Sequence, residues 1–136
     1  MQSSDGVFKN AAAATVQIQS GAMVQVDTPP PSTVTRPFQI MVWAVDLGAA
    51  SGAGISAIHV YAFPVGGGGA VFVGAGTLGL NRADVGNVFG SQFTASGYQL
   101  TWPSSLPAGT YDLVVYAQSS VTGTFDAMKT VRLTVN

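Results

Sequence analysis

The side chains able to do acid–base or metal chemistry are few and scattered along this sequence of 136 residues. His59 is the only histidine, and the chain contains neither cysteine nor glutamate. A typical protein metal site draws on several His, Cys or carboxylate ligands at close spacing. We therefore interpret His59 as a structural histidine on the outer face of a strand. A Ser-His-Asp hydrolase is the weaker alternative, because the sequence has no G-x-S-x-G nucleophile motif.

The aspartates also stand singly. Asp84 follows Arg82 by two residues, and we expect this pair to fix the turn over residues 81–90 rather than to supply a general acid. Paired-carboxylate hydrolysis needs two acids in one cleft. A calcium site built from Asp27, Asp46 or Asp126 with loop carbonyls stays open as an alternative, although no calcium-loop motif is present. The sequence thus predicts a protein that is not an enzyme, with no cofactor and no bound metal.

Aromatic side chains are the other candidates for a binding role. Tyr61, Phe63, Trp102 and Tyr116 are candidate surface aromatic contacts, because an exposed aromatic strip can stack on sugar rings. The alternative is that they belong to the core, as aromatic residues on strands usually do. Two further aromatics are assigned structural roles. Trp43 is expected in the core, and Tyr111, which follows L-P-A-G-T, is expected to form a tyrosine corner.

These residues must be positioned by strands. Residues 106–117 open with a turn and continue as a strand whose two faces are both apolar, so we expect a central strand covered on both sides. The other predicted strands have short spacing and Gly- or Pro-rich turns between them; they cover residues 23–26, 38–46, 58–63, 71–80, 97–102 and 128–135. Residues 71–80 are expected to return as a hairpin. Residues 29–31, three prolines, predict an extended crossing at a sandwich edge.

Two segments differ from this pattern. Residues 81–90 predict a short helical turn that crosses between two sheets, capped by Asn81. Residues 1–21 are mostly polar and predict an arm or linker ahead of a domain over residues 22–136. The arm includes one strictly alternating stretch, a candidate assembly strand that can pair with a sheet edge; its residues are Thr15, Val16, Gln17, Ile18 and Gln19.

Composition limits the partners. Only 8% of residues are charged and the formal net charge is −1, so we expect no nucleic-acid binding through phosphates. No stretch approaches the length of an apolar membrane span, so no membrane insertion is expected. The N-terminal residues do not have the basic and apolar regions of a signal peptide. A surface with so little charge repels copies of itself weakly, which favours self-association.

Several segments together resemble a bacterial immunoglobulin-like domain of secreted and surface proteins. They include V-D-T-P, T-R-P-F, W-A-V-D-L-G-A-A-S-G-A-G, I-H-V-Y-A-F-P, R-A-D-V-G-N-V-F-G-S-Q-F, S-G-Y, L-P-A-G-T-Y-D-L-V-V-Y-A and V-T-G-T-F, between residues 26 and 125. The resemblance implies spacers and accessory modules without shared catalytic residues. The chain departs from the family pattern at Ala83 and near Trp102, which makes Trp102 a candidate added contact residue.

The expected fold is all-β, an immunoglobulin-like antiparallel β-sandwich of seven or eight strands with an N-terminal extended arm. The expected function is a structural or interaction module, a subunit or spacer of an extracellular or particle-surface assembly, in which the arm makes strand contacts with protein partners such as other copies of the chain. A carbohydrate- or cell-surface-binding module that recognises polysaccharide and a viral decoration or fibre protein remain alternatives. The expected location is extracellular or on a cell or particle surface.

Overall fold

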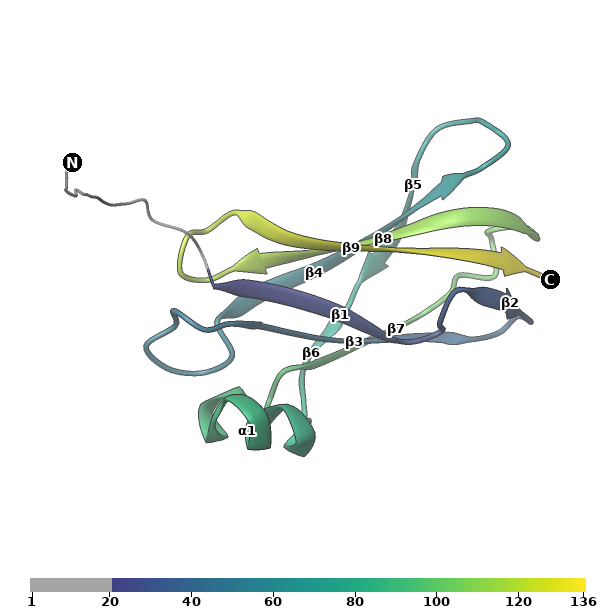
Figure 1. Ribbon diagram of the computed structural model, residues 1–136. Coiled ribbons are helices and arrows are strands. Elements are labelled where there is room, and N and C mark those ends of the chain that lie inside the picture. Colours follow the sequence, from purple (N-terminus) through teal and green to yellow (C-terminus); the bar gives the residue numbers. More distant parts are fainter. Residues whose placement is uncertain (1–20) are drawn as a thin grey trace.

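The computed structural model describes residues 21–136, and the predicted assembly strand at 15–19 lies outside this part. Two β-sheets pack face to face to form an all-β, immunoglobulin-like sandwich (Figure 1). One sheet has four strands in the order β1-β3-β7-β6, and the other has five in the order β2-β9-β8-β4-β5. The strands are β1 (Ala22–Thr28), β2 (Ser32–Val34), β3 (Gln39–Asp46), β4 (Ile55–Pro64), β5 (Val71–Ala75), β6 (Thr77–Leu80), β7 (Gly97–Thr101), β8 (Gly109–Ser119) and β9 (Phe125–Val135).

This strand order is that of immunoglobulin-type sandwiches, in which the first, second, fifth and fourth principal strands face the third, sixth and seventh. Each pair within the sheets is antiparallel except β2 with β9, which run parallel. The proline-rich segment before β2 carries the chain from the edge of one sheet to the edge of the other, as the sequence predicts. The short β2 was not predicted.

The core lies between the sheets and is built from alternating residues of both. In β8, the predicted central strand, Tyr111, Leu113 and Val115 point inward and are buried. β8 lies in the middle of the five-stranded sheet, between β9 and β4, so it is a central strand as expected. The expectation that it is covered on both sides is wrong, because Asp112 and Tyr116 on its outer face are only partly buried and no further layer of the described residues packs there. The Tyr111 hydroxyl donates a hydrogen bond to the backbone oxygen of Pro107 at 2.8 Å, which is the contact of a tyrosine corner.

The predicted hairpin over residues 71–80 is wrong in its second half. β5 pairs with β4, but β6 pairs with β7 in the other sheet. The chain crosses at Gly76, where a Cβ atom would lie 3.4 Å from the Cβ atoms of both Ile58 and Tyr98. Those two side chains belong to opposite sheets, so a residue without a side chain suits the crossing.

The helical turn is also placed differently from the prediction. α1 (Ala83–Phe89) and the 3-10 turn η1 (Ser91–Phe93) join β6 to β7, two strands of the same sheet, so this segment does not cross between sheets. Arg82 occupies the N-cap position, without a side-chain cap hydrogen bond, instead of Asn81. The segment covers the outer face of the four-stranded sheet, where a small second core contains Val45, Val85 and Phe93.

The two tryptophans exchange the positions that the sequence suggests. Trp43 is half-buried on the outer face of the four-stranded sheet, with its ring 5.9 Å from that of Phe89 on α1, so it is not in the core between the sheets. Trp102 is not a surface contact, because it is only 3% exposed. Its ring stacks on Phe38 at 5.3 Å and meets Tyr111 edge-on at 5.2 Å.

Trp102 is buried because it continues the alternation of β7. Tyr98 points into the core, and Leu100 and Trp102, two and four positions later, share its face of the strand. The Trp102 amide donates to the Phe38 oxygen at 3.0 Å, which keeps the chain beside β3 after β7 has ended. The indole therefore closes one end of the core.

Candidate binding surface on the five-stranded sheet

The outer face of the five-stranded sheet carries a cluster of aromatic side chains that no other layer of the described residues covers. We call this cluster the aromatic face. Its members point away from the core, because the residues alternating with them, among them Ile58, Val60 and Ala62 in β4, point inward and are buried. The aromatic face consists of His59, Tyr61, Phe63, Phe72, Tyr116, Phe125 and Met128.

Strand register brings these side chains together from four neighbouring strands. His59 of β4 lies opposite Tyr116 of β8, and Tyr116 lies opposite Met128 of β9. Tyr61 lies opposite Phe72 across the β4–β5 pair. Side chains directly opposite on one face of a sheet are near enough to touch.

The rings pack against one another with centroid separations of 4.9 to 5.9 Å. His59 contacts Phe125 at 4.9 Å and Phe72 at 5.5 Å, while Tyr61 contacts Phe72 at 5.2 Å. Tyr61 and Tyr116 meet edge-on at 5.9 Å. Most of these rings are tilted or edge-on, so the cluster forms a contoured surface rather than a flat platform.

A hollow of about 270 Å³ opens in this surface, lined by His59, Tyr61, Tyr116 and Phe125. Its wall is mostly carbon, although the Tyr61 and Tyr116 hydroxyls and the His59 imidazole belong to lining residues. Within residues 21–136 these polar groups make no hydrogen bond to another protein group. They are therefore free to bind a ligand or a partner.

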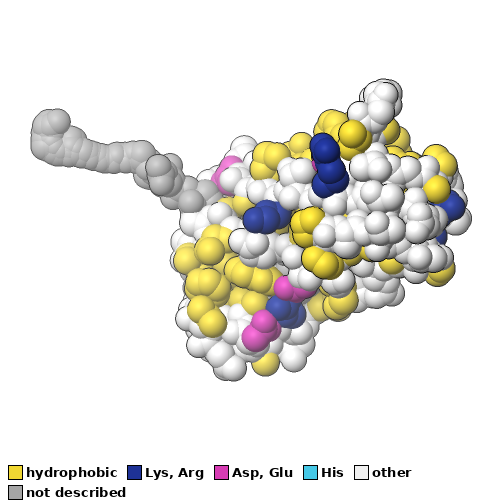
Figure 2. Space-filling model, turned by 45° about the vertical axis from the view of Figure 1, so that its right-hand side comes forward, with side chains coloured by type: hydrophobic (Ala, Val, Ile, Leu, Met, Phe, Trp, Pro, Cys, Tyr) yellow, Lys and Arg dark blue, Asp and Glu magenta, His cyan; other side chains and the backbone are white. Residues whose placement is uncertain are grey.

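Charge is nearly absent from the aromatic face and balanced at its border. Arg132 of β9 donates two hydrogen bonds to Asp112 of β8, at 2.9 and 3.0 Å. This bidentate pairing lowers the pKa of Asp112 and raises that of Arg132. On the face of the molecule shown in Figure 2, charged side chains are likewise few and lie among uncharged and hydrophobic ones.

Three of the four predicted surface aromatics, Tyr61, Phe63 and Tyr116, lie on this face, whereas Trp102 does not. The sequence pattern does not single out Phe72, Phe125 and Met128, which are 49%, 41% and 57% exposed on the same face. His59 was placed on an outer strand face but was not grouped with the aromatics. The missed signal was its position two residues before Tyr61, on the same face of one strand.

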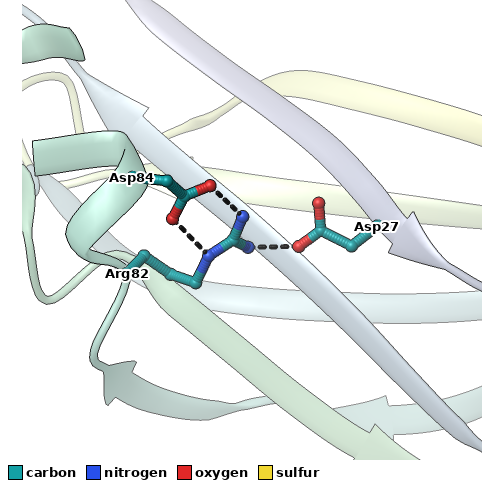
Figure 3. A network of polar contacts seen from close by, with 3 residues as sticks. All are labelled: Asp27, Arg82 and Asp84. Atoms are coloured by element: carbon teal, nitrogen blue, oxygen red, sulfur yellow. Dashed lines mark hydrogen bonds and ion pairs between the residues drawn. The ribbon is translucent and has the colours of Figure 1, made fainter. Parts of the chain in front are cut away.

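The acidic residues occupy structural positions. Arg82 bridges two of them, donating to Asp84 at 2.7 and 3.0 Å and to Asp27 of β1 (Figure 3). The predicted Arg82–Asp84 pair thus forms, and its extension to Asp27 ties the start of α1 to an edge strand. Hydrogen bonding from Arg82 lowers the pKa of Asp84, and hydrogen bonding to Asp84 raises that of Arg82.

Other titratable groups are also held by local contacts. The Asp46 carboxylate is buried and accepts a hydrogen bond from the Ser119 hydroxyl at 2.5 Å, while Asp126 accepts from Thr122 and Thr124. Burial raises the pKa of Tyr98 to about 12. Among the described residues, no three metal-ligating side chains gather in one place. Over the same range, His59 makes no hydrogen bond to an Asp or Ser side chain.

No protein-family model matches the chain, and no curated protein sequence is significantly similar to it. The part of the chain that the structure describes contains no helix with the length and apolar character needed to cross a bilayer. The geometry of the aromatic face is therefore the main evidence on function.

Proposed function

We propose that the chain is a non-catalytic immunoglobulin-like structural or interaction module, related to the bacterial domains that its sequence resembles. In this proposal it acts as a subunit or spacer of an extracellular or particle-surface assembly, of which a virion decoration or fibre is one form. Residues 1–21 contribute strand contacts to the assembly, and the aromatic face contributes an apolar surface.

The observation that carries this proposal is the exposed aromatic face. The largest contiguous apolar patch of a soluble monomer usually measures about 300–600 Å² and is often a functional site. Here four large apolar side chains, Phe63, Phe72, Phe125 and Met128, are between 39% and 57% exposed on one side of one sheet. The low charge of the chain supports the same proposal, because little electrostatic repulsion opposes close packing.

The contribution of residues 1–21 is tested by replacing Ile18 with Pro in the full chain. Proline removes one backbone N–H donor and fits poorly inside a paired strand. If Thr15–Gln19 acts as an assembly strand, we expect association to weaken roughly tenfold or more, measured by light scattering. Ser4→Pro, outside the alternating stretch, is the control and should assemble like the unmodified chain. Equal assembly by all three proteins would contradict the role of this strand.

A carbohydrate-binding module is the second candidate, favoured by the free polar groups around the hollow. Sugars are bound by aromatic rings that contact their apolar faces and by polar groups that reach their hydroxyls. The rings of Tyr61 and Tyr116 and the imidazole of His59 supply both kinds of contact. We place this candidate second because the wall of the hollow is mostly carbon and its rings are tilted against one another.

The carbohydrate hypothesis predicts that the chain migrates more slowly in native gels that contain a polysaccharide it binds than in gels without polysaccharide. Tyr61→Ala should reduce the retardation severalfold, because it removes a ring and a hydroxyl from the hollow. Leu78→Ala, which alters an exposed residue of β6 in the other sheet, should leave it unchanged. Unretarded migration across a broad polysaccharide panel would reject this candidate.

A further inference from the structure

The aromatic face combines a projecting side chain with a hollow. Met128 is 57% exposed, the largest exposed fraction among the large hydrophobic side chains of the five-stranded sheet. It lies opposite Tyr116, which lines the hollow together with His59, Tyr61 and Phe125. A knob and a hole thus lie side by side on one surface.

This combination is self-complementary. In a dimer with a two-fold axis both subunits use the same patch, so each must offer the feature that the other receives. An axis between Met128 and the hollow would place each Met128 in the hollow of the second copy. Methionine suits that position, because its unbranched side chain fills irregular gaps and its sulfur makes favourable contacts with aromatic rings.

The charges at the border of the face allow such an approach. Arg132 and Asp112 neutralise each other within one copy through two hydrogen bonds. When two copies meet through this face, the Arg132–Asp112 ion pair of each copy therefore places no unpaired charge in the contact. At the same border, the hydroxyls of Thr110 and Thr134 lie 3.2 Å apart and provide an uncharged polar rim.

The aromatic face supplies somewhat more than half of the area that a standard contact between two copies buries on each partner. Taking about 200 Å² for a large side chain, the exposed parts of the aromatic face present roughly 500 Å². A standard interface buries about 800 Å² per partner, of which the apolar centre is only a part. The aromatic face can supply the centre, and the surrounding polar residues of the sheet can supply the remainder.

We propose that the aromatic face is a homotypic interface, in which Met128 of each copy enters the hollow formed by His59, Tyr61, Tyr116 and Phe125 of a second copy. This inference rests on the proposed function, because it names the partner of the exposed face as another copy of the chain. It requires no contribution from residues 1–21.

The test is sedimentation equilibrium of the full chain and three variants. Met128→Gln keeps an unbranched side chain of similar length but places a polar amide among the rings. We expect its self-association to be at least tenfold weaker than that of the unmodified chain. Met128→Leu should stay near the unmodified affinity, and Leu78→Gln, on β6 of the other sheet, should not change it. Because Met128 and Leu78 are both exposed, all three variants should unfold at nearly the same denaturant concentration as the unmodified chain.

The inference is overturned if the unmodified chain stays monomeric, or if Met128→Gln associates as strongly as Leu78→Gln. A monomer that binds polysaccharide through Tyr61 would also overturn it and would assign the face to carbohydrate. The arm variants separate this inference from the proposed function. If Ile18→Pro associates more weakly than the unmodified chain and Met128→Gln associates equally well, the assembly role is retained and this interface is rejected.

Discussion

Replacing Trp102 with Ala is expected to lower the free energy of unfolding by about 3–5 kcal/mol, the usual cost of removing a large aromatic side chain from a core. The indole is 3% exposed and contacts the rings of Phe38 and Tyr111. Its removal leaves a cavity at one end of the sandwich, next to the tyrosine corner. Denaturant unfolding followed by circular dichroism measures this loss without relying on tryptophan emission.

Trp43→Ala is the matched control, since it removes the same side chain from a half-buried position beside α1. We expect a smaller loss, about 1–2 kcal/mol, because less apolar area returns to water. In this variant Trp102 is the only tryptophan left, and its emission should be blue-shifted and poorly quenched by iodide. A cost below about 1 kcal/mol for Trp102→Ala would instead place that ring on the surface.

Replacing Asp46 with Ala is expected to destabilise the fold by about 3 kcal/mol or more, because hydrogen bonds to buried charged groups are costly to lose. The carboxylate is fully buried. It accepts hydrogen bonds from the amides of Gly21 and Gly48, at 3.2 and 2.8 Å, and from the Ser119 hydroxyl at 2.5 Å. One side chain thereby joins the start of β1, the loop after β3 and the end of β8.

Asp46→Asn separates charge from shape. The amide keeps one acceptor oxygen but directs an NH₂ group toward donors, so we expect a loss smaller than that of Asp46→Ala but still measurable by thermal unfolding. Asp112→Ala, at a carboxylate on the sheet surface, should cost much less than either. If Asp46→Ala and Asp112→Ala unfold at the same temperature, Asp46 does not have the structural role described here.

The sequence was informative where a local pattern determines a local structure. The apolar residues on both faces of β8 correctly predicted a strand in the middle of a sheet, although only one face is covered, and L-P-A-G-T before Tyr111 predicted the tyrosine corner. The two-fold alternation also placed Tyr61 and Phe63 on one outward face. These features depend on neighbours in sequence and on the period of an extended strand, both of which can be seen in the sequence.

The errors occurred where structure depends on contacts distant in sequence. Residues 77–80 resemble the continuation of a hairpin, and only their pairing with β7 shows that they join the other sheet. The three-residue β2 exists because β9 lies beside it, so no local pattern reveals it. The departure from a family pattern suggests a surface contact for Trp102, whereas its alternation with Tyr98 indicates the core, where the structure places it.

The aromatic face was predicted only in part for the same reason. Phe72 joins Tyr61 through the register of the β4–β5 pair, which contains an irregularity between Val60 and Tyr61. Phe125 reaches the hollow because the β8–β9 register shifts between Ala117 and Gln118, and β9 begins three residues before the strand predicted at Met128. Such shifts decide which side chains share a face.

The central claim is that this chain associates through its own surfaces. It is tested most directly by light scattering of the unmodified Met1–Asn136 chain over a wide range of protein concentration, combined with negative-stain imaging. We predict a mass above the 13.8 kDa of one chain that increases with concentration, accompanied by defined oligomers, filaments or shells. A constant mass of 13.8 kDa at every concentration, with no particles larger than a monomer, would contradict the proposal.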